Sequence, residues 1–504
     1  MSSFADKVAG GALWMVGFKF TQRFIGIIST IILARLLIPE DFGLVAMAMA
    51  FYAFIWLIGS FGFDMALIQN QDAERHHYNA AWTLNVGYGF ISAILLVAAA
   101  PLLTGAFDEP RLQAIVYAFA AIAVVQGFEN IGIVAFRKEL QFDKEFLFQV
   151  AKKVVAFVVT VTLAFALRSY WALVIGIMAS RLTGVTLSYW LHPYRPWFGL
   201  RGTRDLFSFS GWIVINNLAT FAKGRGPDFV LARLAGAGEV GLYRISKEIS
   251  NLPTTELTRP IMRAVFPGYA KIAKDPERLR KAFLDVQGTA ALVTIPAGLT
   301  VVALADPLVR LVLGSNWLDA IPLIQVLGIY GVIMVLKGTS AALFLALGVP
   351  YWVAVLALLE TALALPMMAW LLTAYDLQVA VWAFVASGLA MTPVVAHLYK
   401  RLIGVTLRQR LALLWRPLGC GTVMAIAAWW GGTQLPVAQN EVEAAVQLAI
   451  LLPVAGIVFL VTILGAWRLS GAPKGPETRA WEIAQRVMPP LARVSGYLAR
   501  KPST

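Results

Sequence analysis

The sequence is poor in cysteine and charged residues, and each shortage excludes a class of protein. The single cysteine, Cys420, excludes an internal disulfide and a cysteine-based metal cluster. Only 14% of the 504 residues are charged and 59% are hydrophobic, whereas an average soluble domain is about one quarter charged. A soluble core cannot absorb that much apolar surface, so most of this chain must have the lipid bilayer as its solvent.

Apolar stretches of about twenty residues, the length that crosses a bilayer, predict about fourteen transmembrane helices. The first six are expected near residues 10–35, 42–68, 79–105, 111–136, 145–167 and 170–191. After a basic connector, eight more are expected near residues 207–232, 240–264, 281–305, 320–347, 351–373, 378–398, 412–431 and 443–467. The sequence therefore predicts an all-α, multi-pass membrane protein.

Lysine and arginine gather in alternate connections between these spans. About 26 of them lie on the side of the N-terminus and about 5 on the opposite side, which is the asymmetry expected of cytoplasmic loops. We therefore expect both termini to be cytoplasmic. The net charge of +14 follows from this topology, so we expect no nucleic-acid partner.

An internal repeat indicates the organisation of the domains. The segment LARLLIPEDFGL from Leu33 is similar, without gaps, to LARLAGAGEVGL from Leu231, and Trp14 and Trp212 share the same register. An even number of spans separates the copies, so the repeat is parallel. We expect two pseudo-symmetric six-helix lobes around a central cavity, 1–194 and 195–405, then two extra helices in 406–470 and a basic amphipathic cytoplasmic tail, 471–504, lying on anionic lipid.

Two stretches carry a resemblance to a known family. The segment LARLLIPEDFGLVAMAMAFYAFIWLIGSFGFDMALIQNQDAERHHYNAAWTLN begins at Leu33, and FPGYAKIAKDPERLRKAF begins at Phe266. The first resembles the opening of the polysaccharide transporter family, which comprises the oligosaccharide flippases of the multidrug/oligosaccharidyl-lipid/polysaccharide exporter superfamily. The second resembles the connector after the eighth helix in that family.

This resemblance implies a function. It implies a V-shaped fold with alternating access, and an undecaprenyl-diphosphate-linked glycan as cargo. The cargo would be the repeat unit of an O-antigen, a capsule or an exopolysaccharide, moved from the cytoplasmic to the periplasmic leaflet of the bacterial inner membrane. Membrane lipids, and the polymerase and chain-length proteins of the same pathway, are the expected partners. The sequence shows no nucleotide-binding loop, nucleophile triad or metal site, so we expect no cofactor and no enzyme activity.

Cations inside the spans are the candidate substrate ligands. An ionisable residue at mid-membrane costs about 2.5 to 3.5 kcal/mol, so it normally faces the protein interior. Lys19 and Arg23 lie one turn apart in a span without an acidic residue. We predict that cavity cations coordinate the carrier diphosphate; the set is Lys19, Arg23, Lys223, Arg225, Arg244, Lys247 and Lys337.

Two arginines of this set also have an acidic residue at helical spacing. Asp228 follows Arg225 by three residues and Glu248 follows Arg244 by four, so each pair has the spacing of an intrahelical ion pair. For these two arginines the sequence leaves structural and functional roles open.

Acidic and amide residues inside the spans have two interpretations each. Asp64, Glu129, Asp285 and Glu360 either bind a coupling proton or sodium ion or balance the cations, including Lys19 and Arg23. Asn216 and Asn217 either contact sugar hydroxyls or hold helices together.

Three other functions compete with this interpretation. A lipid II flippase handles the same diphosphate carrier, so the cations do not exclude it. A drug/cation antiporter of the same superfamily shares the two-lobed repeat, but basic residues disfavour a cationic cargo. A polysaccharide polymerase or ligase would typically have a large periplasmic loop, and none of the outward loops predicted here is long enough.

Overall fold

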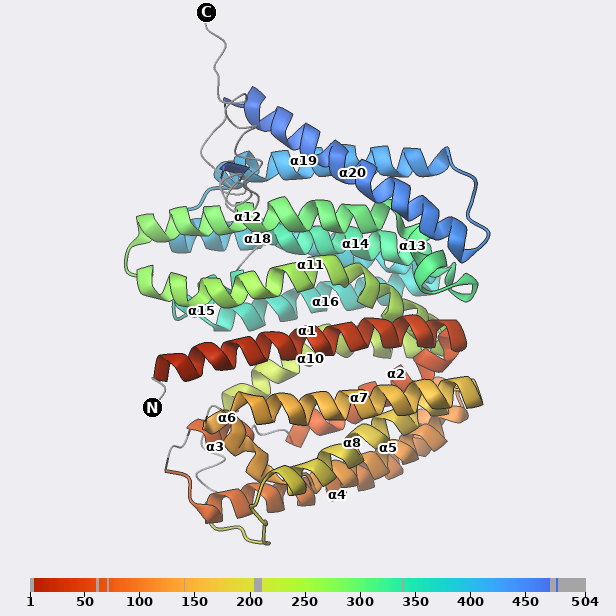
Figure 1. Ribbon diagram of the computed structural model, residues 1–504, viewed down its shortest axis with the longest axis vertical. Helices are drawn as coiled ribbons and strands as arrows, with labels where there is room; N and C mark the ends of the chain where they lie inside the picture. Colours follow the sequence, from red (N-terminus) through yellow and green to blue (C-terminus); the bar gives the residue numbers. More distant parts are fainter. Residues whose placement is uncertain are drawn as a thin grey trace, which may run out of the picture. The chain divides into compact units, whose positions relative to one another are not determined.

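The computed structural model describes residues 4–59, 63–69, 72–139, 141–203, 211–337, 340–471 and 477–478. Within these ranges the regular secondary structure is entirely helical (Figure 1), which confirms the predicted all-α class. The chain divides into two compact units: unit 1 contains Met1–Arg244 and Val312–Trp317, and unit 2 contains Ile245–Leu311 and Leu318–Thr504. The lobe boundary expected near residue 195 stays a prediction.

Unit 1 consists of long helices joined by short connections. Its elements are α1 (Phe4–Leu36), α2 (Pro39–Gly59), α3 (Phe63–Gln69), α4 (Arg75–Phe107), α5 (Arg111–Gly127), η1 (Ile131–Ile133), α6 (Val134–Lys138), α7 (Phe142–Leu167), α8 (Trp171–Leu191), α10 (Gly211–Leu234), the start of α11 (Ala237–Ile272), and η2 (Ser315–Trp317).

Unit 2 has the same construction. It contains the rest of α11, then α12 (Pro276–Ala303), α13 (Ala305–Val312), α14 (Ala320–Lys337), α15 (Ser340–Ala346), α16 (Tyr351–Ala374), α17 (Leu377–Ala380), α18 (Trp382–Ile403), α19 (Leu407–Thr433) and α20 (Glu441–Leu469).

Each predicted span coincides with a helix, or with a broken pair of helices, in the described ranges. Among the described residues, 10 helices are long and apolar enough to cross a membrane, or 11 if α5 and α6, bent by 65°, form one span. The remaining predicted spans are α1, α10 and α11, and these helices carry most of the candidate cations. The helices are thus consistent with the predicted count.

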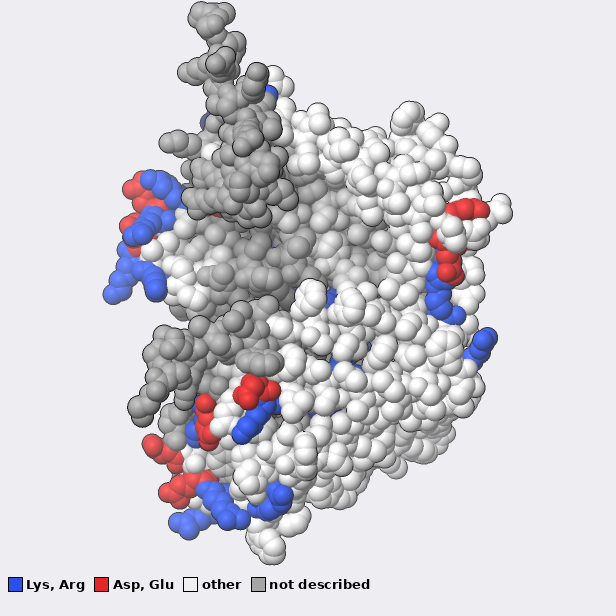
Figure 2. All heavy atoms as spheres, in the orientation of Figure 1, with Lys and Arg blue, Asp and Glu red and all other residues white. Residues whose placement is uncertain are grey.

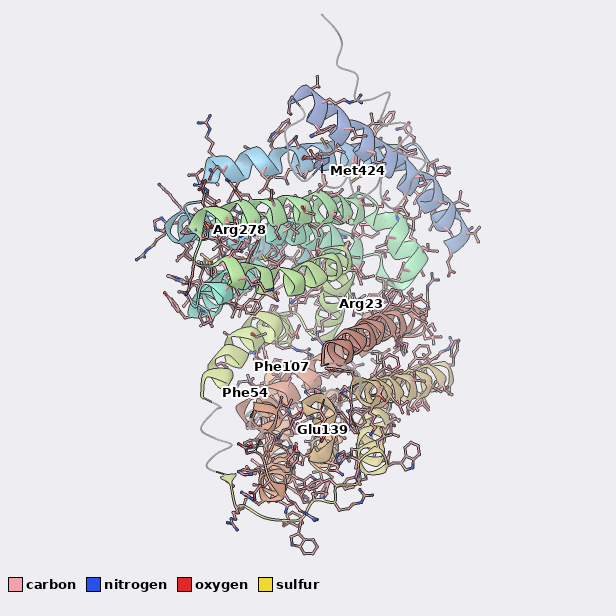
Figure 3. All side chains as sticks on the ribbon, turned by 60° about the vertical axis from the view of Figure 1, so that its left-hand side comes forward. Arg23, Phe54, Phe107, Glu139, Arg278 and Met424 are labelled. Carbon is pink, nitrogen blue, oxygen red and sulfur yellow. The ribbon has the colours of Figure 1, made fainter. Side chains whose placement is uncertain are left out.

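Local sequence explains where several helices begin and end. Asp275 precedes α12, and its carboxylate accepts a hydrogen bond from the amide of Arg278, which Figure 3 labels. Asn440 caps α20 in the same way by accepting from the amide of Glu443. At the end of α18, Gly404 has a φ of 67°, the left-handed conformation in which glycine is favoured.

The two copies of the internal repeat pack against each other inside unit 1. Gly43 and Gly241 are equivalent positions of the repeat, and so are Pro39 and Ala237. A methyl group on Gly43 would collide with the Ala237 carbonyl, and one on Gly241 would collide with the Pro39 carbonyl. The contact is therefore reciprocal, as expected for parallel copies related by a local two-fold axis.

Aromatic contacts join α2 to neighbouring helices of unit 1. The rings of Phe54 and Phe221 in α10 lie 5.7 Å apart, and those of Phe51 and Phe107 in α4 lie 5.3 Å apart, measured between centroids. Figure 3 labels Phe54 and Phe107. Packing of this kind is worth about 0.5 to 1.5 kcal/mol for each pair beyond the buried area.

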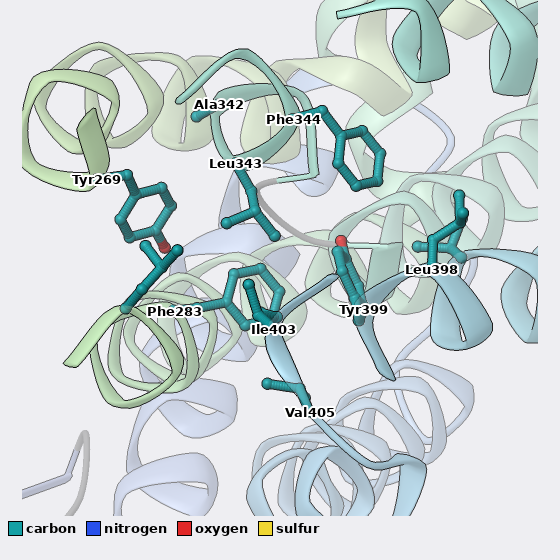
Figure 4. Packing of buried hydrophobic residues seen from close by; sticks show 11 residues of the cluster. Tyr269, Phe283, Ala342, Leu343, Phe344, Leu398, Tyr399, Ile403 and Val405 are labelled. Carbon is teal, nitrogen blue, oxygen red and sulfur yellow. The ribbon is translucent and has the colours of Figure 1, made fainter. Parts of the chain in front are cut away.

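An apolar cluster joins four helices of unit 2. Tyr269 of α11, Phe283 of α12 and Tyr399 of α18 pack with Leu343 and Phe344 of α15 (Figure 4). The Phe283 and Tyr399 rings lie 4.7 Å apart. All five side chains are almost completely buried, so this cluster holds the short helix α15 against the longer ones.

The surface of the helices is suited to lipid. Large apolar side chains are exposed along α4, α7, α16 and α20. In Figure 2 the charged side chains gather near the ends of the helices, and a broad, mostly uncharged band lies between them. The protein is a multi-pass membrane protein, because an aqueous solvent would not tolerate so much exposed apolar surface.

Candidate functional site

The candidate cations are distributed over four helices. The described side chains are at least half-buried: Arg23 on α1 (Figure 3), Lys223 and Arg225 on α10, Arg244 and Lys247 on α11, and Lys337 on α14. The side chains of Lys19, Asn216 and Asn217 lie outside the described residues, as do those of Trp14 and Trp212.

In unit 1, two arginines share one carboxylate. Asp228 of α10 is 2% exposed, and its Oδ2 lies 3.6 Å from Nη1 of Arg225 and 3.3 Å from Nη2 of Arg244. The ion pair of Arg225 with Asp228 is as predicted, and Arg244 of α11 also meets Asp228. The three side chains together carry one net positive charge. A half-buried cluster with this excess attracts an anion.

Lys337 in unit 2 has an acidic partner on another helix. Its Nζ lies 2.9 Å from Oε1 of Glu360 on α16, and the hydroxyl of Tyr330 donates to the same oxygen at 3.0 Å. The hydroxyl of Tyr399 donates to the Lys337 carbonyl. This buried pair is electrically neutral, which favours charge balance over ligand binding for both residues.

The acids proposed as partners for the α1 cations form ion pairs with cations of other segments. The carboxylate of Glu129 lies 3.2 Å from Nζ of Lys152 on α7, and Asp64 lies 3.2 Å from Nη2 of Arg137. Each pair joins two segments of unit 1. Such contacts favour charge balance for Asp64 and Glu129, although the sequence alone left the choice open.

Asp285 is the remaining acidic candidate. It is half-buried on α12, and its backbone carbonyl accepts a hydrogen bond from the hydroxyl of Thr289 at 2.8 Å. The two roles predicted for Asp285, ion coupling and charge balance, stay predictions.

Sequence reasoning did not single out Arg410, a further buried cation of unit 2. Arg410 is 2% exposed in the first turn of α19. Its Nε donates to Gln287 at 3.3 Å, and its guanidinium lies 4.9 Å from the ring centroid of Tyr399. The sequence placed Arg410 among the cytoplasmic loop cations, and no local signal distinguished it from them. Only the packing of α19 on α12 and α18 buries it.

Curated relatives resemble the chain over much of its length. It is 24% identical to the teichuronic acid biosynthesis protein TuaB of Bacillus subtilis over 93% of this chain and 97% of the relative. It is 25% identical to the lipopolysaccharide biosynthesis protein WzxC of Escherichia coli over 68% and 71%. It is 24% identical to the succinoglycan biosynthesis transport protein ExoT of Rhizobium meliloti over 64% and 66%.

Solved structures show the same fold. A structure titled lipid II flippase MurJ, in an inward closed conformation, matches with a TM-score of 0.66 at 13% identity, over 91% of this chain and 99% of that one. The MATE multidrug transporter DinF-BH matches with a TM-score of 0.54 at 16% identity, over 80% and 98%. At these identities the likeness shows the fold alone.

The family model gives the assignment. Residues 32–322 match the model of a family described as polysaccharide biosynthesis protein, and this range is more than half of the chain. It includes both segments on which the resemblance to polysaccharide transporters was based, so that prediction is confirmed. The chain belongs to the polysaccharide biosynthesis protein family.

Proposed function

We propose that this protein is a flippase and not an enzyme. Its cargo is an undecaprenyl-diphosphate-linked oligosaccharide, the repeat unit of an O-antigen, capsule or exopolysaccharide. Alternating access moves this cargo from the cytoplasmic to the periplasmic leaflet of the bacterial inner membrane, and both termini are cytoplasmic. The names of the relatives support the substrate class, because they concern the biosynthesis of surface polysaccharides and, for ExoT, their transport.

One observation of unit 1 carries this proposal: Arg225 and Arg244 both meet the carboxylate of Asp228. Guanidinium groups match phosphate oxygens with two parallel hydrogen bonds, so each can bind the carrier diphosphate while the other keeps Asp228 paired. Lys223 lies on α10 of the same unit and adds positive charge to it, whereas Lys247 belongs to unit 2. We assign the diphosphate to the C-terminal half of α10 and to the part of α11 that belongs to unit 1, Ala237–Arg244.

The same cluster disfavours one of the competing functions. A drug/cation antiporter would bring a positive cargo to a site with a positive excess, which costs electrostatic energy. A lipid II flippase would bring a diphosphate, so the cluster accepts that carrier equally well. The relatives' names favour a polysaccharide repeat unit over lipid II.

The experiment is an export assay in a bacterium that lacks its own copy of the transporter. Arg225→Gln and Arg244→Gln should each reduce surface glycan by about tenfold or more, because a charge-assisted hydrogen bond is worth about 1.5 to 3 kcal/mol. Lipid-linked oligosaccharide should accumulate at the same time. The measurements are surface glycan and the membrane pool of lipid-linked oligosaccharide.

Arg233→Gln is the matched control. Arg233 is an exposed arginine on the same helix, α10, so its substitution changes the charge without touching the cluster, and export should stay normal. Normal export by both cluster variants, with each protein present in the membrane, would overturn the proposed site. Loss of lipid II transport, with surface glycan unaffected, would show that the cargo is lipid II.

A further inference from the structure

The connector after α8 is held against the bundle of unit 1. We call residues 192–203 the strap. The side-chain oxygen of Asn79 on α4 accepts a hydrogen bond from the hydroxyl of Tyr194, and the hydroxyl oxygen of Thr83 accepts from the amide of Gly199 at 3.0 Å. The composition of this basic connector predicts a loop, and these hydrogen bonds hold it against α4.

A cavity of about 440 Å³ lies between the strap, the start of α4 and the end of α6. Its walls are formed by Arg75, Tyr78, Ala135, Glu139, His192, Pro193, Tyr194 and Arg195. Asn130, which is completely buried, donates through Nδ2 to the Tyr194 carbonyl at 2.7 Å. Figure 3 labels Glu139 at the end of α6. The cavity is therefore built into the fold, and its volume suits a small polar ligand.

The wall of this cavity has an excess of one positive charge. Arg75 and Arg195 are exposed and oppose the single carboxylate of Glu139. The guanidinium of Arg75 lies 5.9 Å from the ring centroid of Tyr194, which restrains it at the edge of the cavity. Nδ1 of His192 accepts from the Tyr194 amide at 3.2 Å, so the proton of the neutral imidazole is on Nε2, where it is available as a donor.

The surroundings of the cavity are those of a membrane surface. Trp190, Trp197, Phe198 and Leu200 are between 63% and 78% exposed, and they flank or belong to the strap. Exposed tryptophan beside arginine is typical of the boundary between hydrocarbon and head groups. Charged side chains gather at this end of unit 1 in Figure 2. A ligand that enters here meets the protein at the level of lipid head groups.

We propose that this cavity binds the phosphodiester head group of an anionic phospholipid. A phosphodiester carries one negative charge, which matches the excess on the wall, and the two guanidinium groups and the histidine supply donors for its oxygens. The tryptophans and Phe198 would hold the acyl chains at the interface. This site is formed by α4, α6 and the strap, so it does not depend on the flippase proposal.

The test uses the purified full chain in detergent, with phosphatidylglycerol as the probe and phosphatidylcholine as its zwitterionic counterpart. We expect phosphatidylglycerol to raise the melting temperature and to stay bound in native mass spectrometry. Arg75→Gln should reduce the retained phosphatidylglycerol at least fivefold. Arg75→Lys keeps the charge and should restore most of it. Arg201→Gln removes an exposed arginine of the strap outside the cavity and should leave retention unchanged.

Two results would overturn the proposal. Equal retention of phosphatidylglycerol by the wild type and by Arg75→Gln, with both proteins monodisperse, would show that the cavity is not the site. An equal rise of the melting temperature with water-soluble glycerophosphoglycerol would show that the cavity binds a free phosphodiester, and the assignment to lipid would be wrong. Glycan export is not used as a readout, so failure here leaves the flippase proposal intact.

Discussion

At the scale of single residues, the chain neutralises its buried cations in two different ways. Lys337 forms an ion pair with Glu360 in unit 2, whereas Asp228 in unit 1 meets both Arg225 and Arg244. The pair of Lys337 with Glu360 has no net charge, whereas Asp228 with its two arginines has one net positive charge. The same type of substitution should therefore have different effects at the two places.

Lys337→Gln should destabilise the protein. The substitution leaves the Glu360 carboxylate buried with a tyrosine as its hydrogen-bond donor, and breaking a buried pair typically costs about 3 to 5 kcal/mol. The melting temperature in detergent should fall, and Glu360→Gln in the same chain should restore part of it. An unchanged melting temperature for Lys337→Gln would contradict the structural role of this pair.

At the Asp228 cluster, the acid and the base should behave differently. Asp228→Asn leaves two neighbouring guanidinium groups without their shared carboxylate and should lower the melting temperature clearly. Arg225→Gln leaves the pair of Asp228 with Arg244, so its melting temperature should stay close to that of the wild type. Thermal unfolding of both variants measures this, and equal losses would show that Arg225 is structural.

His192 should make the strap sensitive to acid. Burial holds the pKa of His192 below its ordinary value, chiefly because the charged form loses its hydration. The unfolded chain therefore takes up a proton first as the pH falls below about 6.5, and unfolding becomes easier until the pH passes the lower pKa of the folded state. His192→Gln should remove this part of the pH dependence. Melting curves between pH 7.5 and 5 would show it as a flatter profile.

At the scale of elements, the reciprocal contact of Gly43 and Gly241 joins α2 to α11. Gly43→Ala should destabilise unit 1 by about 1 to 3 kcal/mol, because the added methyl group meets a backbone carbonyl that cannot yield as a side chain would. The readout is the melting temperature. Gly26→Ala on α1 is the control: nothing lies near the added methyl group, so this variant should be as stable as the wild type or slightly more stable. A loss that is equal in both variants would refute the close contact.

At the scale of the whole molecule, the charge asymmetry predicts that both termini are cytoplasmic. Gly348 lies between α15 and α16, and Asp376 lies between α16 and α17, so α16 separates them. Reporter fusions at Gly348 and Lys400 should be cytoplasmic, and those at Asp108 and Asp376 should be periplasmic. The opposite result at two or more of these sites would invalidate the order of the spans.

The helices and the repeat were accessible from the sequence, because hydrophobicity along one helix is a local property. Every predicted span coincides with a helix or a broken pair. The break between α5 and α6 was not predicted. There, the side-chain oxygen of Asn130 accepts a hydrogen bond from the Gly132 amide. The backbone amide of Asn130 donates to the hydroxyl of Ser188, which is 58 residues away. A partner so distant leaves no local signal.

The sequence by itself determined the membrane class, the helical segments, the family and the list of intramembrane charges. Only the tertiary structure decided which charges meet. Lys152 of α7 meets Glu129 in the bend after α5, and Lys337 of α14 meets Glu360 of α16; the partners are 23 residues apart in each case. The tertiary structure also decided that the basic connector after α8 forms part of the wall of a cavity. The physical reason is that the hydropathy of a segment depends on its own residues alone, whereas ion pairs and cavities depend on atoms that folding brings together.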